Sequence, residues 1–112
     1  MSADPPRHRH ALELLRKAFR PEAAEGERVT YQLVLTGDAP GQLWVDVRDG
    51  RLDTGEGVRA APDVTFHIES GDFLGVLEGR VNPDLLFMED RLRVEGELSL
   101  ALKLRKLFRA PT

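Results

Sequence analysis

His67 is the side chain in this sequence best suited to proton-transfer chemistry. It stands between Thr65 and Glu69 at alternate positions of the run Val64 to Glu69, whose period of two predicts a β-strand. A histidine beside a carboxylate can act as a general acid or base near neutral pH. The alternation places these three side chains on the polar face of the strand, where no pocket would hold a substrate. We therefore expect a surface histidine and predict no catalytic residue.

Other groups that could do chemistry lack the necessary spacing. His8 and His10 stand two residues apart, which suits neither a helical metal-binding pair nor a zinc motif, so we expect a frayed basic terminus. Gly55-Glu56-Gly57 is similar to a phosphate-binding loop, but no helix follows to hold an anion, and a bulge or turn is expected. The carboxylate pairs Glu89-Asp90 and Glu95/Glu97 flank or occupy a predicted surface strand. We predict no metal site and no cofactor.

The composition excludes further classes of function. The chain has 112 residues, which fits one domain, and its 16 Lys+Arg against 19 Asp+Glu give a net charge of -3 that argues against a nucleic-acid partner. The lack of cysteine excludes disulfides and thiolate chemistry. No stretch resembles a secretory signal or a membrane span, so we expect a cytoplasmic protein. We expect one domain over residues 7–109 between tails at 1–6 and 110–112.

Period-two patterning predicts the strands. The runs 29–36, 42–48 and 64–68 alternate apolar and polar side chains, and 91–97 forms a shorter strand of the same kind. Asp49-Gly50 predicts a tight hairpin, because a type I′ turn needs positive φ at both central residues. The glycine-containing run 51–58 predicts a weak strand at a sheet edge. Each clear strand has one apolar face, which indicates a sheet with helices on one side and solvent on the other.

Helical spacing appears in four further segments. A helix is predicted from Arg7 to the residues before Pro21, and another begins near Ser70 as N-cap and ends at Gly79. Asn82-Pro83 restarts a helix, and the following residues 85–88 have no polar side, so we expect that short helix to be buried nearly all round. The last helix spans 98–108. The whole order predicts an α+β fold.

The last helix carries more apolar surface than one sheet contact requires. Leu100, Leu104, Leu107 and Phe108 share one broad face, whereas Leu98 and Leu102 fall almost opposite. This second stripe could pack on another helix, line a cavity or touch lipid.

Six segments stand in order along the second half of the chain: Asp63 to Ile68, Asp72-Phe73-Leu74, Gly79-Arg80-Val81-Asn82-Pro83, Phe87-Met88, Arg91 to Gly96, and Leu100 to Leu104. This series resembles the sterol carrier protein type-2 domain family, and the likeness covers about residues 7 to 109. The family's pattern has an Asp-started strand, then Asp-Phe-Leu, Gly-Lys-x-Asn-Pro, an aromatic pair, Gly-Lys-Leu-Lys-Ile-x-Gly and Leu-Ala-x-Lys-Leu. The sequence departs from the pattern at Asp90, where the family usually has Gly, and at Arg80 and Arg91, where it has Lys.

The resemblance implies a mixed five-stranded sheet of order 3-2-1-4-5 and a hydrophobic tunnel between the sheet and the helices. It implies non-catalytic binding of a fatty acid, fatty acyl-CoA, sterol-like lipid or phospholipid. We expect apolar side chains from the inner sheet face and from the last three helices to wall the tunnel. These candidate lipid-binding residues are Leu33, Val45, Phe66, Phe73, Leu77, Leu86, Phe87, Met88, Leu92, Leu100, Leu104, Leu107 and Phe108.

Several alternatives stay open at this point. The domain could be an accessory module that presents a lipid-like intermediate to a partner enzyme, or a docking module with a filled core. It could act as a monomer or a homodimer. Transient membrane contact through Leu102 and its basic neighbours would be compatible with lipid transfer.

Overall fold

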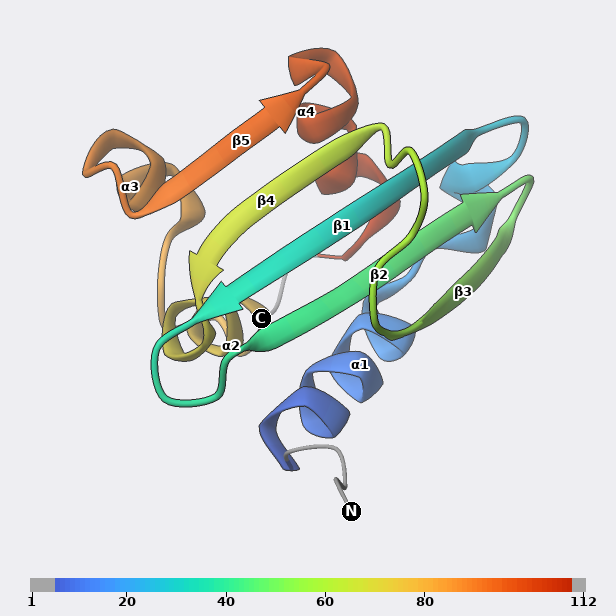
Figure 1. The fold of residues 1–112 in the computed structure, drawn as a ribbon. Helices are drawn as coiled ribbons and strands as arrows, with labels where there is room; N and C mark the ends of the chain where they lie inside the picture. The colour runs from blue at the N-terminus through green and yellow to red at the C-terminus, as the bar shows by residue number, and fades with distance from the viewer. Residues whose placement is uncertain (1–5, 110–112) are drawn as a thin grey trace.

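The computed structural model describes residues 6–109, so the predicted tail residues 1–5 and 110–112 lie outside it. Within that range one mixed sheet carries helices on a single face (Figure 1). The elements in chain order are α1 (Pro6–Ala18), the 3-10 helix η1 (Pro21–Ala24), β1 (Arg28–Thr36), β2 (Gly41–Arg48), β3 (Arg51–Glu56), β4 (Val64–Glu69), α2 (Ser70–Leu77), α3 (Pro83–Met88), β5 (Leu92–Gly96) and α4 (Leu98–Leu107).

The sheet has the order β3-β2-β1-β4-β5, which confirms the predicted α+β fold and strand order. β1 pairs in parallel with β4, and the other neighbours are antiparallel. Two parallel strands need a long connection between them, and here it consists of β2, β3 and the loop that leads to β4. Consequently strands distant in sequence lie side by side at the centre, where Leu33 is opposite Phe66.

The inner face of the sheet holds the core, as the period of two predicts. In β2 the side chains of Leu43, Val45 and Val47 are at most 2% exposed. In β1 the alternate residues from Val29 to Leu35 are likewise buried. The hydrophobic effect therefore selects the register, because a slip of one residue would exchange the buried and the open faces.

The helical layer divides into two parts. α1 runs beneath β2 and β3, whereas α2, α3 and α4 cover β1, β4 and β5 (Figure 1). The segment 57–62 covers the middle of the outer face of the sheet, and beneath it Gln32 of β1 is only 3% exposed. The Gln32 side chain donates a hydrogen bond of 2.9 Å to the Gly57 carbonyl oxygen and accepts one of 2.8 Å from the Arg59 amide. These contacts satisfy a buried polar group on that face.

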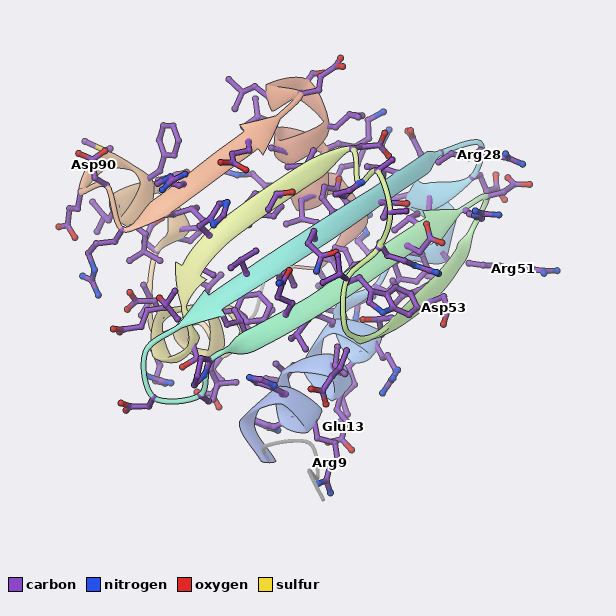
Figure 2. The ribbon with its side chains drawn as sticks, in the orientation of Figure 1. Arg9, Glu13, Arg28, Arg51, Asp53 and Asp90 are labelled. Carbon is purple, nitrogen blue, oxygen red and sulfur yellow. The ribbon has the colours of Figure 1, made fainter. Side chains whose placement is uncertain are left out.

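Two turns follow from backbone conformations anticipated in the sequence. Asp49 and Gly50 have φ values of 47° and 84°, as the predicted tight hairpin requires. Asp90, which replaces the family's glycine before β5, has φ of 60°. Aspartate tolerates this left-handed region better than most residues, so the chain still turns into β5 (Figure 2).

Two local predictions were wrong. His8 is not part of a frayed terminus: it is 2% exposed within α1, and its Nε2 lies 2.7 Å from the carbonyl oxygen of Ala39. The reason is tertiary, because the β1–β2 turn folds back onto α1. Ser70 is not an N-cap; α2 begins at this residue, and its Oγ instead accepts a hydrogen bond from the Ala39 backbone at 3.1 Å.

Candidate functional site

Incompletely buried apolar side chains concentrate in the C-terminal third of the chain. Among the residues the structure describes, six large hydrophobic side chains are exposed, and five of them fall between residues 85 and 102. Contiguous exposed apolar surface on a folded domain commonly marks a ligand or partner site. The exposed side chains in this segment are Leu85, Phe87, Met88, Leu98 and Leu102.

α3 contributes three of these side chains, and the prediction that it is buried nearly all round was wrong. Only Leu86 is buried, at 1% exposure, whereas Phe87 is 52% and Met88 76% exposed. This short helix, which Asn82 caps through its side chain, lies at the β5 edge of the sheet, so only one of its sides finds a packing partner. The sequence shows that the segment is apolar but not that the sheet ends beside it.

α4 presents two apolar faces, as the helical spacing predicts. Ala101 and Leu107 are buried against the body of the protein, and Leu98 and Leu102 are 56% and 57% exposed. Leu100 and Leu104 are half-buried between these extremes, next to the core. A helix that only covered a sheet would not need the outer stripe.

Tyr31 holds α4 over the centre of the sheet. Its hydroxyl donates a hydrogen bond of 2.6 Å to the carbonyl oxygen of Leu100. Its ring is fully buried and stacks on Phe66 with 5.8 Å between centroids. Burial raises the pKa of the phenol far above its ordinary value, so the group stays a neutral donor. The alternation in the run 29–36 puts Tyr31 on the apolar face of its strand but does not show this contact, although a buried tyrosine hydroxyl usually requires a partner.

The C-terminal end of α4 is tied to the end of α1. The rings of Phe19 and Phe108 lie 5.7 Å apart between centroids. Backbone hydrogen bonds join Arg20 to Leu107 at 2.9 Å and Arg109 to Ala18 at 2.6 Å. α4 is therefore anchored at its C-terminal end as well as above Tyr31.

A salt bridge joins α4 to Glu27, the residue before β1. Lys103 Nζ lies 2.7 Å from Glu27 Oε1, and this hydrogen bond lowers the pKa of the Glu27 carboxyl. On the other side of α4, Arg105 pairs with Asp84 of α3, and both side chains are mostly exposed. Such a surface pair contributes about 0–1 kcal/mol, so it is a weak connection between the two helices.

The structure places the candidate lipid-binding residues in three environments. Phe87 and Met88 are exposed. Five are half-buried and pack against the core: Leu77, Leu92, Leu100, Leu104 and Phe108. Six are buried in the core: Leu33, Val45, Phe66, Phe73, Leu86 and Leu107. Val45 lies on β2, in the part of the sheet that α1 covers, whereas most of the others gather around α2, α3 and α4.

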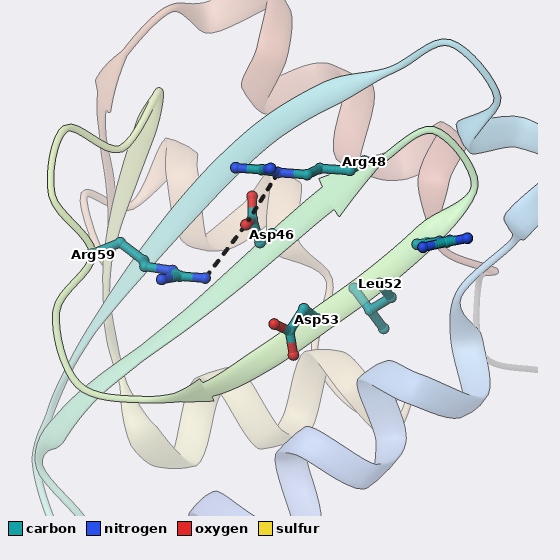
Figure 3. A pocket seen from close by; sticks show the side chains of 6 residues that line it. Asp46, Arg48, Leu52, Asp53 and Arg59 are labelled. Carbon is teal, nitrogen blue, oxygen red and sulfur yellow. Dashed lines mark hydrogen bonds and ion pairs between the residues drawn. The ribbon is translucent and has the colours of Figure 1, made fainter.

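Two polar hollows occur on the outer face of the sheet, away from these residues. In the first, of about 370 Å³, Asp46 lies between Arg48 and Arg59 at 3.6 and 3.4 Å (Figure 3). Arg51, at its rim, points outward into solvent (Figure 2). The Arg59 guanidinium also lies 3.9 Å from the ring centroid of Trp44. The charged side chains are thus paired with one another on an open surface, as in a structural network of ion pairs.

The second hollow, of about 280 Å³, contains His67. Its Nε2 lies 3.2 Å from Glu95 Oε1, and this contact lowers the pKa of the Glu95 carboxyl. Asp72, on the same rim, is paired with Arg91 at 2.7 Å. The histidine therefore belongs to a group of surface ion pairs. Over residues 6–109 no three metal-ligating side chains are grouped so as to hold an ion, and no helix has the length and hydropathy to cross a membrane.

Residues 10–109 match the SCP-2 sterol transfer family. The chain belongs to this family. Its fold is a lipid-binding, non-catalytic one, and the chain is a lipid- or sterol-binding carrier domain. The helical layer around α3 and α4, with its unburied apolar side chains, is thus the candidate site.

Known proteins show the same domain alone and within longer chains. Hydroxysteroid dehydrogenase-like protein 2 of Xenopus tropicalis is 34% identical over 88 residues, which are 78% of this chain and 21% of that protein. The chain thus spans about a fifth of the length of that relative. The solution structure of palmitated SCP2L2 from Aedes aegypti has a TM-score of 0.68 at 22% identity, covering 91% of this chain and 96% of that one. The ubiquinone synthesis protein UbiJ-SCP2 has a TM-score of 0.66 at 15% identity and 90% coverage of both chains.

Proposed function

We propose that the chain binds an elongated apolar ligand between the β1-β4-β5 part of the sheet and helices α2, α3 and α4, and carries it without chemical change. The ligand class is a fatty acid, fatty acyl-CoA, sterol-like lipid or phospholipid. The observation that carries the proposal is the contrast in burial between the two parts of the helical layer.

Beneath α1 most of the inward-facing side chains are fully packed, although Leu14 and Leu52 keep partial exposure. Leu43 and Val47 are fully buried, and Ala11 and Leu15 of α1 are at most 5% exposed. In the part of the layer around α2, β5 and α4, the residues Leu77, Leu92, Leu100 and Leu104 all retain partial exposure although they contact the core. Protein interiors normally pack to crystal-like density. Side chains that face inward and stay accessible are what a surface for an apolar guest requires.

The energetics suit a carrier. Each methylene removed from water contributes roughly 0.8 kcal/mol, so burying about ten gives on the order of 8 kcal/mol before losses. Immobilising the ligand offsets several kcal/mol of this, which leaves binding in the micromolar range. Apolar walls discriminate weakly between ligands of similar shape, so the domain would accept a class of lipids rather than one compound.

The space between α3 and α4 is the proposed entry. Arg105 and Asp84 join the two helices there by a weak exposed pair, while both ends of α4 are held elsewhere. The exposed side chains of Phe87 and Met88 would provide an apolar surface for an arriving chain. Opening this pair would free Arg105 to meet an anionic headgroup, such as a carboxylate or phosphate.

Extraction of small molecules from freshly purified protein, followed by mass spectrometry, would test the proposal together with titration of a fluorescent fatty acid. We expect co-purified lipid and saturable binding with one ligand per chain. Protein that carries no lipid and neither binds nor exchanges the fluorescent acid would refute it.

A second candidate function rests on the chain's similarity to longer proteins. An accessory domain would present its lipid to an enzyme encoded in the same or another chain; in hydroxysteroid dehydrogenase-like protein 2 the matching region is about a fifth of the protein. Stable co-purification with one enzyme, whose turnover depends on the added domain, would favour this role over free carriage.

A further inference from the structure

The outer edge of β5 is open. β5 is the last strand of the sheet, and no described strand pairs with its far side (Figure 1). An unpaired edge exposes backbone donors and acceptors that can bond another strand, and proteins often block such edges with lysine or proline. The five residues of β5, Leu92–Gly96, include neither.

The charges along β5 complement a second copy of the same strand. Arg93 and Glu95 flank Val94 and point to the outer face of the sheet, where both are exposed. If two β5 strands run antiparallel about an axis at Val94, Arg93 of each copy is opposite Glu95 of the other. The next outward pair sets Arg91 against Glu97 of the second copy. The same row of charges would repel a second copy in parallel register.

In β5 the residue at the centre of this pairing directs its backbone hydrogen-bonding groups away from β4. Val64 is opposite Gly96 in the β4–β5 ladder, and the Glu97 amide bonds the carbonyl oxygen of Asp63. Bonded and non-bonded positions alternate in an antiparallel ladder, so Arg93 and Glu95 direct their backbone groups towards β4. Val94 therefore directs its N–H and C=O to the free edge, where they would bond Val94 of the second copy.

The flanking helices supply apolar surface for the same contact. α3 precedes β5 and α4 follows it, so antiparallel pairing brings α3 of one copy beside α4 of the other. Phe87 and Met88 on the first helix and Leu98 on the second are all exposed by more than half. Their mutual burial would add a hydrophobic contribution to the strand pairing. Phe87 and Met88 also border the proposed entry, so the dimer covers them and the lipid would enter the monomer.

We infer that the chain forms a two-fold homodimer through antiparallel pairing of β5 with β5 of a second copy, in a register centred on Val94. The contact makes one continuous sheet of the two. In the single chain Glu95 is 3.1 Å from Arg93 and 3.2 Å from His67. These exposed pairs contribute little, so Glu95 can exchange them for Arg93 of the second copy. Arg91 keeps its bond to Asp72 while facing the partner strand.

Sedimentation velocity over a range of protein concentrations, with charge-reversal variants, tests this register. We expect the unaltered chain to shift from monomer to dimer as concentration rises. Arg93→Glu and Glu95→Arg should each sediment as monomers, because each sets like charges opposite one another twice in the dimer. An equimolar mixture of the two variants should dimerise again, since every facing pair is then of opposite sign.

Two further variants separate this contact from general effects. Arg51→Glu reverses a charge on the other edge strand and should leave the dimer unchanged. Val94→Pro removes an N–H that points to the free edge and should abolish the dimer while circular dichroism still shows the fold. A chain that stays monomeric at every concentration would overturn the inference. So would single reversals that remain dimeric, or a mixture of the two reversals that stays monomeric.

Discussion

Substitution of Leu104 by tryptophan tests whether a ligand occupies the space under α4. Leu104 is half-buried on the side of α4 that faces the core, so a larger side chain there would extend into the proposed binding space. Displacing about two or three ligand methylenes, at roughly 0.8 kcal/mol each, costs about 2 kcal/mol. This corresponds to a dissociation constant that is roughly thirtyfold higher.

Leu102→Trp is the matched control. It makes the same change two residues earlier on the same helix, where the side chain is 57% exposed. Titration of a fluorescent fatty acid should give weakened binding for Leu104→Trp and little change for Leu102→Trp.

The free energy of unfolding of the ligand-free variants gives an independent measurement. If the region can accommodate a guest, the tryptophan at position 104 enters it with little loss of stability. If the interior is already filled, overpacking should cost about 1–3 kcal/mol. Unchanged lipid affinity for Leu104→Trp, together with a stability loss in that range, would refute the proposed ligand position.

Four other predictions follow from individual contacts. Tyr31→Phe removes the hydroxyl bonded to α4 and should lower the unfolding free energy by about 1 kcal/mol, with hydrogen exchange accelerated in α4 but not in β2. The hydrogen bond from Lys103 lowers the pKa of Glu27 in the folded chain, so the ionised carboxylate stabilises the fold above its ordinary pKa. This stabilisation is lost as the pH falls through the lowered pKa. Glu27→Gln should therefore flatten the fall in unfolding free energy over this acidic range. Gly96→Ala should destabilise strongly in chemical denaturation, because the added Cβ would lie 2.3 Å from a backbone oxygen at a φ of 107°. Phe87→Asp should change stability by no more than about 0.5 kcal/mol, because the ring is exposed, but slow fatty-acid uptake in stopped-flow fluorescence.

Local patterns predicted the strands and turns. The alternation from Val29 to Leu35 identified the buried face of β1, and Asp49-Gly50 identified the hairpin that follows β2. The position of the 51–56 strand at a sheet edge also followed from its glycine content. These features depend on neighbours within a few residues, so short-range sequence carries the information.

The candidate site was predictable only in part. The outer stripe of α4 at Leu98 and Leu102 was visible in the helical spacing, but only the structure shows that it is exposed. The anchoring of α4 by Tyr31 was not visible, because it joins residues 69 positions apart. The burial of His8 was missed for the same reason, since the carbonyl it contacts is 31 residues away.

The amino-acid sequence by itself determined which side chains point inward from each element and where the chain turns, because side-chain direction follows the local backbone period. The tertiary structure alone decided which inward-facing side chains are fully packed and which stay accessible. α3 shows the difference: its apolar residues 85–88 predicted a buried helix, yet most remain exposed because the sheet ends at β5. Burial depends on the partners that distant segments bring, and the period of one segment does not specify those partners.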